Sequence, residues 1–78
     1  MGIATEVGRF VGRERVLGVE VVGGVLYKGT TISYGDFGLK LLVTATGYAE
    51  KGGCVLQEHD VPFELFIAEH AIKTARLL

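Results

Sequence analysis

The sequence predicts a mainly β fold of the α+β class, a small antiparallel barrel or curled meander with a C-terminal helix. Three observations support this fold class. The chain has 78 residues, which suits a single domain over 1–78. Eleven of its twelve glycines fall between Gly8 and Gly53 and divide that region into short pieces. Those pieces are rich in Val, Leu, Thr and Tyr, which favours strands joined by tight turns.

The first predicted element is a hairpin over residues 16–34, where two β-rich runs flank Gly23 and Gly24. Glycine adopts the positive φ angles of type I′ and II′ turns without steric cost, and these turns match the twist of hairpin strands. Residues 35–38, Gly-Asp-Phe-Gly, predict a second turn, and residues 39–48 predict the next strand.

A third turn is predicted at residues 50–53, followed by a short strand at 54–57 and a polar cluster at 58–60. The alternation of apolar and polar residues is imperfect, so apolar side chains are expected on both faces of the sheet. Both faces therefore need cover, from closure into a barrel or from a partner. The runs concerned are Val21-Val22, Val25-Leu26 and Leu41-Leu42-Val43.

The last segment fits two interpretations. Apolar residues alternate over 61–66, which predicts a strand, while the residues from about Ala68 to the end are good helix formers. We expect a strand near 61–66 followed by a C-terminal helix. The alternative is one longer helix that begins at Asp60 as its cap.

Composition indicates self-association. Hydrophobic residues make up 49% of a chain so short that it buries only about 60% of its surface alone, so a homo-oligomer is expected. Eight Lys and Arg against nine Asp and Glu give a net charge of -1, and no DNA partner is expected.

The number of cysteines and the hydrophobic pattern indicate the cellular compartment in which the protein is expected. Cys54 is the only cysteine, so no internal disulfide forms, and residues 1–15 lack the apolar region of a signal peptide. We expect a cytoplasmic protein. The longest weakly polar stretch, 16–27, contains Glu20 and three glycines, so no membrane span is predicted.

The segment from Gly24 to Ile32 has the spacing Gly-Val-Leu-x-x-Gly-x-x-Ile. This spacing resembles the small β-barrel that follows the GTPase domain in translation factors such as elongation factor Tu. The resemblance implies that Val25 and Leu26 fill the barrel and that Gly29 makes the turn into the next strand. Residues 40–46 look like the family's middle strand, and residues 60–65 look like its late apolar strand.

The chain also departs from that family. Thr30 stands where the family usually has an acidic residue, and the nucleotide-binding domain is absent, so GTP hydrolysis is not carried over. Barrels punctuated by glycine also occur as components of RNA–protein particles and as interaction modules.

The function predicted from these features is that of a non-enzymatic binding module for RNA or a ribonucleoprotein. A basic strand with an aromatic residue binds phosphates and stacks a base. The predicted RNA-binding residues are Arg9, Phe10, Arg13, Arg15 and Lys28. The alternative for 13–15 is a solvated turn with local ion pairs.

A second functional hypothesis is a homo-oligomeric structural or regulatory assembly protein. A third is an oligomer that binds a small molecule, or acts as an enzyme, at a site between subunits that uses His59 or His70. Residues 50–70 carry five acidic residues and one lysine, so any RNA contact is confined to the N-terminal side. The same polarity suits a basic face meeting an acidic face in an oligomer.

No catalytic, metal or cofactor site is predicted. The candidate ligands Cys54, His59, Asp60 and His70 have no zinc-type spacing, and neighbouring strand residues such as Glu58 and His59 point to opposite faces. Most aromatic side chains are expected in the core. Tyr34 and Phe37 flank a turn and would be interface anchors if they are exposed.

Overall fold

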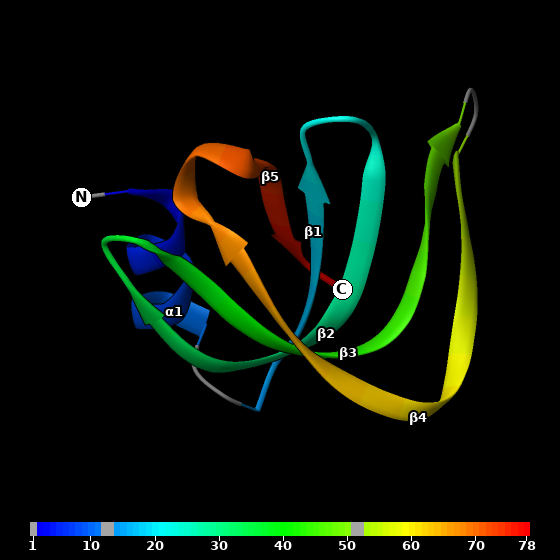
Figure 1. Cartoon of the computed structure of the whole chain (residues 1–78), viewed down its shortest axis with the longest axis horizontal. Helices are drawn as coiled ribbons and strands as arrows, with labels where there is room; N and C mark the ends of the chain where they lie inside the picture. Colours follow the sequence, from blue (N-terminus) through cyan, green and yellow to red (C-terminus); the bar gives the residue numbers. More distant parts are fainter. Residues whose placement is uncertain (1, 12–13, 51–52) are drawn as a thin grey trace.

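The computed structural model describes residues 2–11, 14–50 and 53–78. Over these residues the chain forms one α-helix, five strands and one turn of 3-10 helix (Figure 1). The strands form one antiparallel sheet in the order β4-β3-β2-β1-β5, which confirms the mainly β prediction. The elements are α1 (Ile3–Val11), β1 (Val16–Val21), β2 (Val25–Gly35), β3 (Gly38–Glu50), β4 (Gly53–Ala68), η1 (Glu69–Ala71) and β5 (Ile72–Leu77).

The predicted glycine turns join the first three strands. Gly23 and Gly24 have φ angles of 108° and 91° between β1 and β2, a conformation that favours glycine. The second turn is also confirmed, because Gly35 at the end of β2 pairs with Gly38 at the start of β3. The third predicted turn spans 50–53, of which residues 51–52 lie outside the described residues.

Strands β2, β3 and β4 bend near their middles, which curls the sheet (Figure 1). On β4, Phe63 lies opposite Val43 whereas Glu58 lies opposite Ala45. Residues 59–62 of β4 are therefore left opposite Thr44 alone, and this irregularity includes Pro62, which cannot donate a ladder hydrogen bond. We call the part of β3 and β4 beyond this bend, residues 45–50 and 53–58, the arm.

Gly29 permits the corresponding bend in β2. The pairing of β2 with β3 shifts register between Lys28 and Gly29, and a Cβ on Gly29 would overlap the backbone carbonyl of Leu42. Only glycine allows the two backbones to approach this closely. The turn into the next strand that the resemblance implied at this residue is not formed, because Gly29 lies within β2 and the next strand begins only at Gly38.

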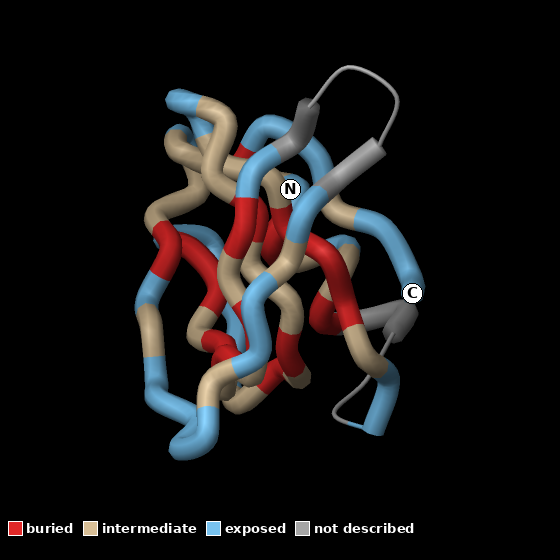
Figure 2. The backbone as a smooth tube through the Cα atoms, turned by 90° about the vertical axis from the view of Figure 1, so that its right-hand side faces the viewer, coloured by how far each residue is buried: buried red, intermediate tan, exposed pale blue. Residues whose placement is uncertain are grey.

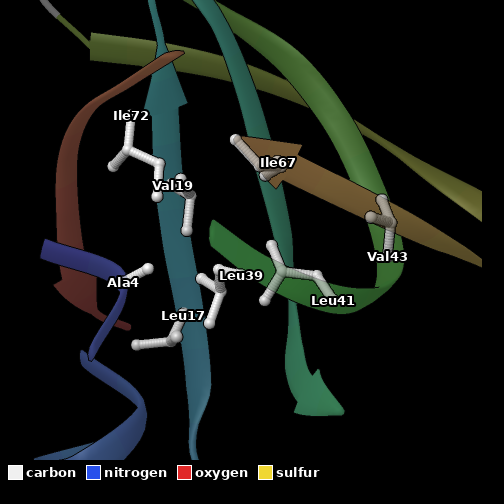
Figure 3. Close-up of a cluster of buried hydrophobic side chains, with 8 residues drawn as sticks. All are labelled: Ala4, Leu17, Val19, Leu39, Leu41, Val43, Ile67 and Ile72. Carbon is white, nitrogen blue, oxygen red and sulfur yellow. The ribbon is translucent and has the colours of Figure 1, made fainter. Parts of the chain in front are cut away.

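The core lies on the concave face of the curled sheet, which we call the inner face. The buried stretches of the backbone gather in the middle of the molecule (Figure 2). Aliphatic side chains from several strands meet there, and α1 adds Ala4 (Figure 3). Each fully buried Leu, Val or Ile contributes about 1.5–3 kcal/mol by leaving water. The cluster consists of Ala4, Leu17, Val19, Leu39, Leu41, Val43, Ile67 and Ile72.

The predicted C-terminal helix from Ala68 is wrong, as is the longer helix beginning at Asp60. A strand near 61–66 is confirmed as part of β4, and it is followed by η1 and β5. Strand β5 pairs with β1, with Ala75 opposite Val19 and Leu77 opposite Leu17. The hydrogen bonds that β5 forms with the edge of β1 therefore outweigh the intrinsic helix propensity of the β5 residues.

The N-terminal segment forms helix α1 instead of the predicted basic strand. Ala4 and Gly8 are buried and Val7 is half-buried, a spacing of three and four residues that places them on one helical face. This face covers the end of the core, with contacts from α1 to β2, β3 and β5.

Candidate assembly interface

The structure does not bring the predicted RNA-binding residues together on one strand. Arg9 and Phe10 belong to α1. Arg13 lies outside the described residues, and Arg15 is exposed directly before β1. The predicted binding segment is thus divided between a helix and the approach to the first strand.

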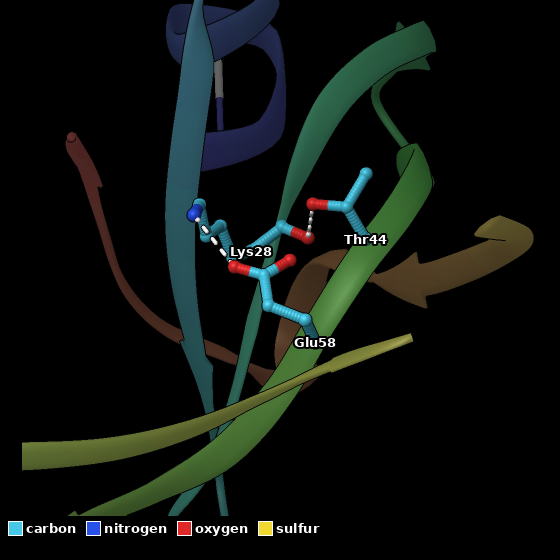
Figure 4. A network of polar contacts seen from close by, with 3 residues as sticks. All are labelled: Lys28, Thr44 and Glu58. Carbon is cyan, nitrogen blue, oxygen red and sulfur yellow. Dashed lines mark hydrogen bonds and ion pairs between the residues drawn. The ribbon is translucent and has the colours of Figure 1, made fainter. Parts of the chain in front are cut away.

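Lys28 lies on β2 opposite Gly18, on the outer, convex face of the sheet. Its Nζ is 3.1 Å from Oε1 of Glu58 on β4 (Figure 4). Strand β3 lies between the two strands, and its Ala45 pairs with both Lys28 and Glu58. The Thr44 hydroxyl donates to the Lys28 carbonyl oxygen at 3.3 Å. The charge of Lys28 is therefore already compensated by a carboxylate of the same chain.

Similar ion pairs cross the strands elsewhere on the outer face. Lys40 lies 3.3 Å from Glu64, and Lys73 lies 3.5 Å from Glu20. Such exposed pairs contribute about 0–1 kcal/mol each. Their main effect is to leave a solvated surface of balanced charge.

Strand β4 is one edge of the sheet, since among the described residues only β3 pairs with it. The edge is long and carries large apolar side chains: Val61 is 79% exposed and Phe66 is 57% exposed. Val55 and Phe63 are exposed as well. A long apolar edge is a template for pairing with another strand.

Strand β5 is the other edge, paired only with β1 within the described sheet. Leu77 is 53% exposed, and Leu78, directly after the strand, is exposed too. Lys73 and Arg76 are exposed and give this edge a basic character, whereas the exposed acidic residues of β4 are Glu58, Asp60 and Glu64.

The two edges match face by face. Directly paired residues share a face of the sheet, so Phe63, opposite Val43, and Leu77, opposite Leu17, both belong to the inner face. Glu64, opposite Leu42, and Arg76, opposite Gly18, both belong to the outer face. A β4 edge beside a β5 edge thus aligns Phe63 with Leu77 on the inner face and Glu64 with Arg76 on the outer face, where Phe66, opposite Lys40, also lies.

The expectation that most aromatic residues lie in the core is wrong. Tyr48, Phe63 and Phe66 are exposed on β3 and β4. Of the two turn aromatics, Phe37 is exposed, and Tyr34 is half exposed and lies against Gly8 of α1. Sequence reasoning missed the β4 aromatics as surface residues because strand alternation does not say which face will be covered.

His59 lies in the bend of β4, where its side chain contacts Thr46 and Phe63. Its Nε2 lies 2.7 Å from the Thr46 hydroxyl oxygen, and its ring meets Phe63 edge-on with centroids 5.2 Å apart. Within residues 2–11, 14–50 and 53–78, no three His, Cys, Asp or Glu side chains gather in a group suited to a metal ion.

Comparison with protein-family models, curated proteins and solved structures finds no match for this chain. The likeness to the translation-factor barrel therefore stays a prediction. In the part of the chain that the structure describes, no helix is long and apolar enough to cross a membrane.

Proposed function

We propose that this protein is a self-assembling module in which the β4 edge of one copy pairs with the β5 edge of the next. The observation that supports it best is the β4 edge, with Val61, Phe63 and Phe66 exposed on one strand. Soluble proteins usually shorten, twist or cover such an edge to prevent pairing. Glu58 and Glu64 lie among these residues but are paired with Lys28 and Lys40 of the same chain, so the selection of a basic partner at this edge would rest on Asp60.

The β5 edge of a second copy has the required chemistry. It offers Leu77 to the inner face and Arg76 to the outer face. Because alternate residues share a face whichever way a strand runs, this match holds for either direction of pairing. It favours β4–β5 contact over β4–β4 contact, which would place acidic residues beside acidic residues.

Such pairing is head-to-tail. Each copy uses two different surfaces, so the assembly closes into a ring if the rotation between copies allows it and otherwise grows as a filament. In either case the sheet of one copy continues into the next.

Two variants test the pairing by multi-angle light scattering at micromolar concentration. Phe66→Asp disables the β4 edge and Leu77→Asp disables the β5 edge, and each is expected to be monomeric because a charge replaces an exposed apolar contact. An equimolar mixture should give a species of twice the monomer mass, joined through the one intact edge of each type. Val22→Asp, a change at an exposed turn residue, serves as the control and should assemble like the unmodified chain.

A strictly monomeric unmodified protein would overturn the proposal. So would a Phe66→Asp variant that still forms dimers, because that result would show β5 edges pairing with each other.

RNA or ribonucleoprotein binding remains a second candidate, favoured by the exposure of Arg15 beside the end of α1. It predicts that affinity for single-stranded RNA falls with rising salt and is lost when Arg9, Arg13 and Arg15 are all changed to Ala. Lys28→Ala should have little effect, because Glu58 already compensates that charge. Fluorescence anisotropy that detects no RNA binding at low salt would end this hypothesis.

A further inference from the structure

Helix α1 is held at its N-terminus by a carboxylate from the other end of the chain. The backbone N–H groups of Ile3 and Ala4 both donate to the side chain of Glu69, the latter at 2.8 Å. The first N–H groups of a helix have no partner within it, and a negative charge beside them is also favoured by the helix dipole. Glu69 thus supplies both a hydrogen-bond acceptor and a charge to α1.

Two further contacts fix the position of the helix. Gly8 lies so close to the Tyr34 ring that a Cβ there would overlap it. Ala4 is fully buried in the same cluster as Leu17 and Ile72. The helix is therefore docked at its start by Glu69 and along its face by core contacts.

Glu69 also belongs to η1, which is tied to both neighbouring turns. Its own N–H donates to the Phe37 carbonyl oxygen at 2.9 Å, and the Val22 N–H donates to the Ala71 carbonyl oxygen at 2.8 Å. Strand β5 begins at the next residue, Ile72. The carboxylate that holds α1 is thus three residues before the first residue of β5.

We infer that α1, held by Glu69, is a clamp that orders β5 for assembly. The inference rests on the proposed function, because it makes the β5 edge conditional on the docking of α1. Glu69 acts here as a positioning residue and does not itself contact the second copy.

We expect α1 to matter for β5 because few other contacts hold this strand in place. The strand has six residues and, among the described elements, pairs only with β1. Its first residue, Ile72, is buried together with Ala4 of α1. Release of α1 would open the cluster around Ile72 to water and leave β5 held by its ladder to β1 and by the packing of Ala75 on the core, so the strand would open more often.

Hydrogen exchange followed by mass spectrometry tests the clamp in the full chain, with Glu69→Ala as the test variant. We expect amide exchange in α1 and in β5 to accelerate roughly tenfold, the factor expected from the loss of a helix cap. Exchange in the β2–β3 pair should stay unchanged. Glu6→Ala removes an exposed acidic residue from the first turn of the same helix and is the matched control, with no acceleration in β5.

Light scattering on the same variants then tests the link to assembly. Glu69→Ala should dissociate at severalfold higher concentration than the unmodified chain, and Glu69→Gln, which keeps one acceptor oxygen, should fall between them. If α1 exchanges faster while β5 and assembly are unchanged, or if α1 keeps its protection in Glu69→Ala, the clamp is wrong. A monomeric unmodified protein would instead contradict the proposed assembly, and the exchange of β5 would still decide whether the clamp exists.

Discussion

Strands β3 and β4 run through two different environments on the two sides of their bend. Before the bend, Leu41 and Val43 on β3 are fully buried (0% exposed). Beyond it, in the arm, Tyr48 on β3 and Val55 on β4 are 62% and 61% exposed, although both also belong to the inner face. On the inner face, the same two strands are therefore core on one side of the bend and surface on the other, whereas Ala45 of the arm is buried on the outer face.

The difference in burial depends on which elements pack over the inner face, and not on how apolar the strand residues are. On one side of the bend, α1, η1 and β5 close over the inner face and contribute Ala4 and Ile72 to the cluster. Over the arm, no described element does so. Apolar residues in a strand thus indicate a surface that will be covered, but they do not say whether the same chain provides the cover.

The largest expected effect contrasts the two sides directly. Leu41→Ala should lower the free energy of unfolding by about 2–5 kcal/mol, because it leaves a cavity in a fully buried site. Val55→Ala should lower it by less than about 0.5 kcal/mol, because the side chain is mostly in water. Urea denaturation of a monomeric background such as Phe66→Asp measures both, and equal losses would contradict the contrast.

An intermediate effect is expected at the bend that separates the two sides. Gly29→Ala should lower the free energy of unfolding by about 1–3 kcal/mol, because the new methyl group meets the Leu42 carbonyl and the strands must move apart. Gly35→Ala is the control, since a Cβ there has open space around it. The interpretation of the bend fails if Gly29→Ala is as stable as the unmodified chain.

The smallest effect is expected on the outer face. Lys28→Ala should change the free energy of unfolding by about 0–1 kcal/mol, because its pair with Glu58 is partly exposed. The difference should shrink as salt is added and screens the pair. Thermal unfolding at low and high salt measures it, and a larger loss that salt does not reduce would indicate a packing role for the lysine stem.

The sequence predicts the parts of the fold that depend on neighbouring residues. The hairpin at Gly23 and Gly24 follows from local backbone preference, and so do the turn before Gly38 and the strand after it. Strand β5 was mistaken for a helix because its conformation depends on β1, a strand from the other end of the chain. Helix α1 was missed because its apolar face is short and because Gly8 and Gly12, which have low helix propensity, lie within and directly after it.

The candidate interface was less predictable than the fold. Self-association was expected from composition, but its location was not, because the exposure of Phe63 and Phe66 depends on which part of the sheet α1 covers. The pairing of Lys28 with Glu58 also depends on the bend and on the register across β3. Such relations between distant residues leave no local signal in a single sequence.

The position of β1 between β2 and β5 has a consequence for folding. The ladder that joins Val19 to Ala75 links opposite ends of the chain, so it closes a long loop and is expected to form late. Until then one side of β1 is open and accepts the last strand of any copy, which favours exchange of β5 between molecules that fold at high concentration. A copy therefore gains the edge proposed for assembly in the same step that completes its own core.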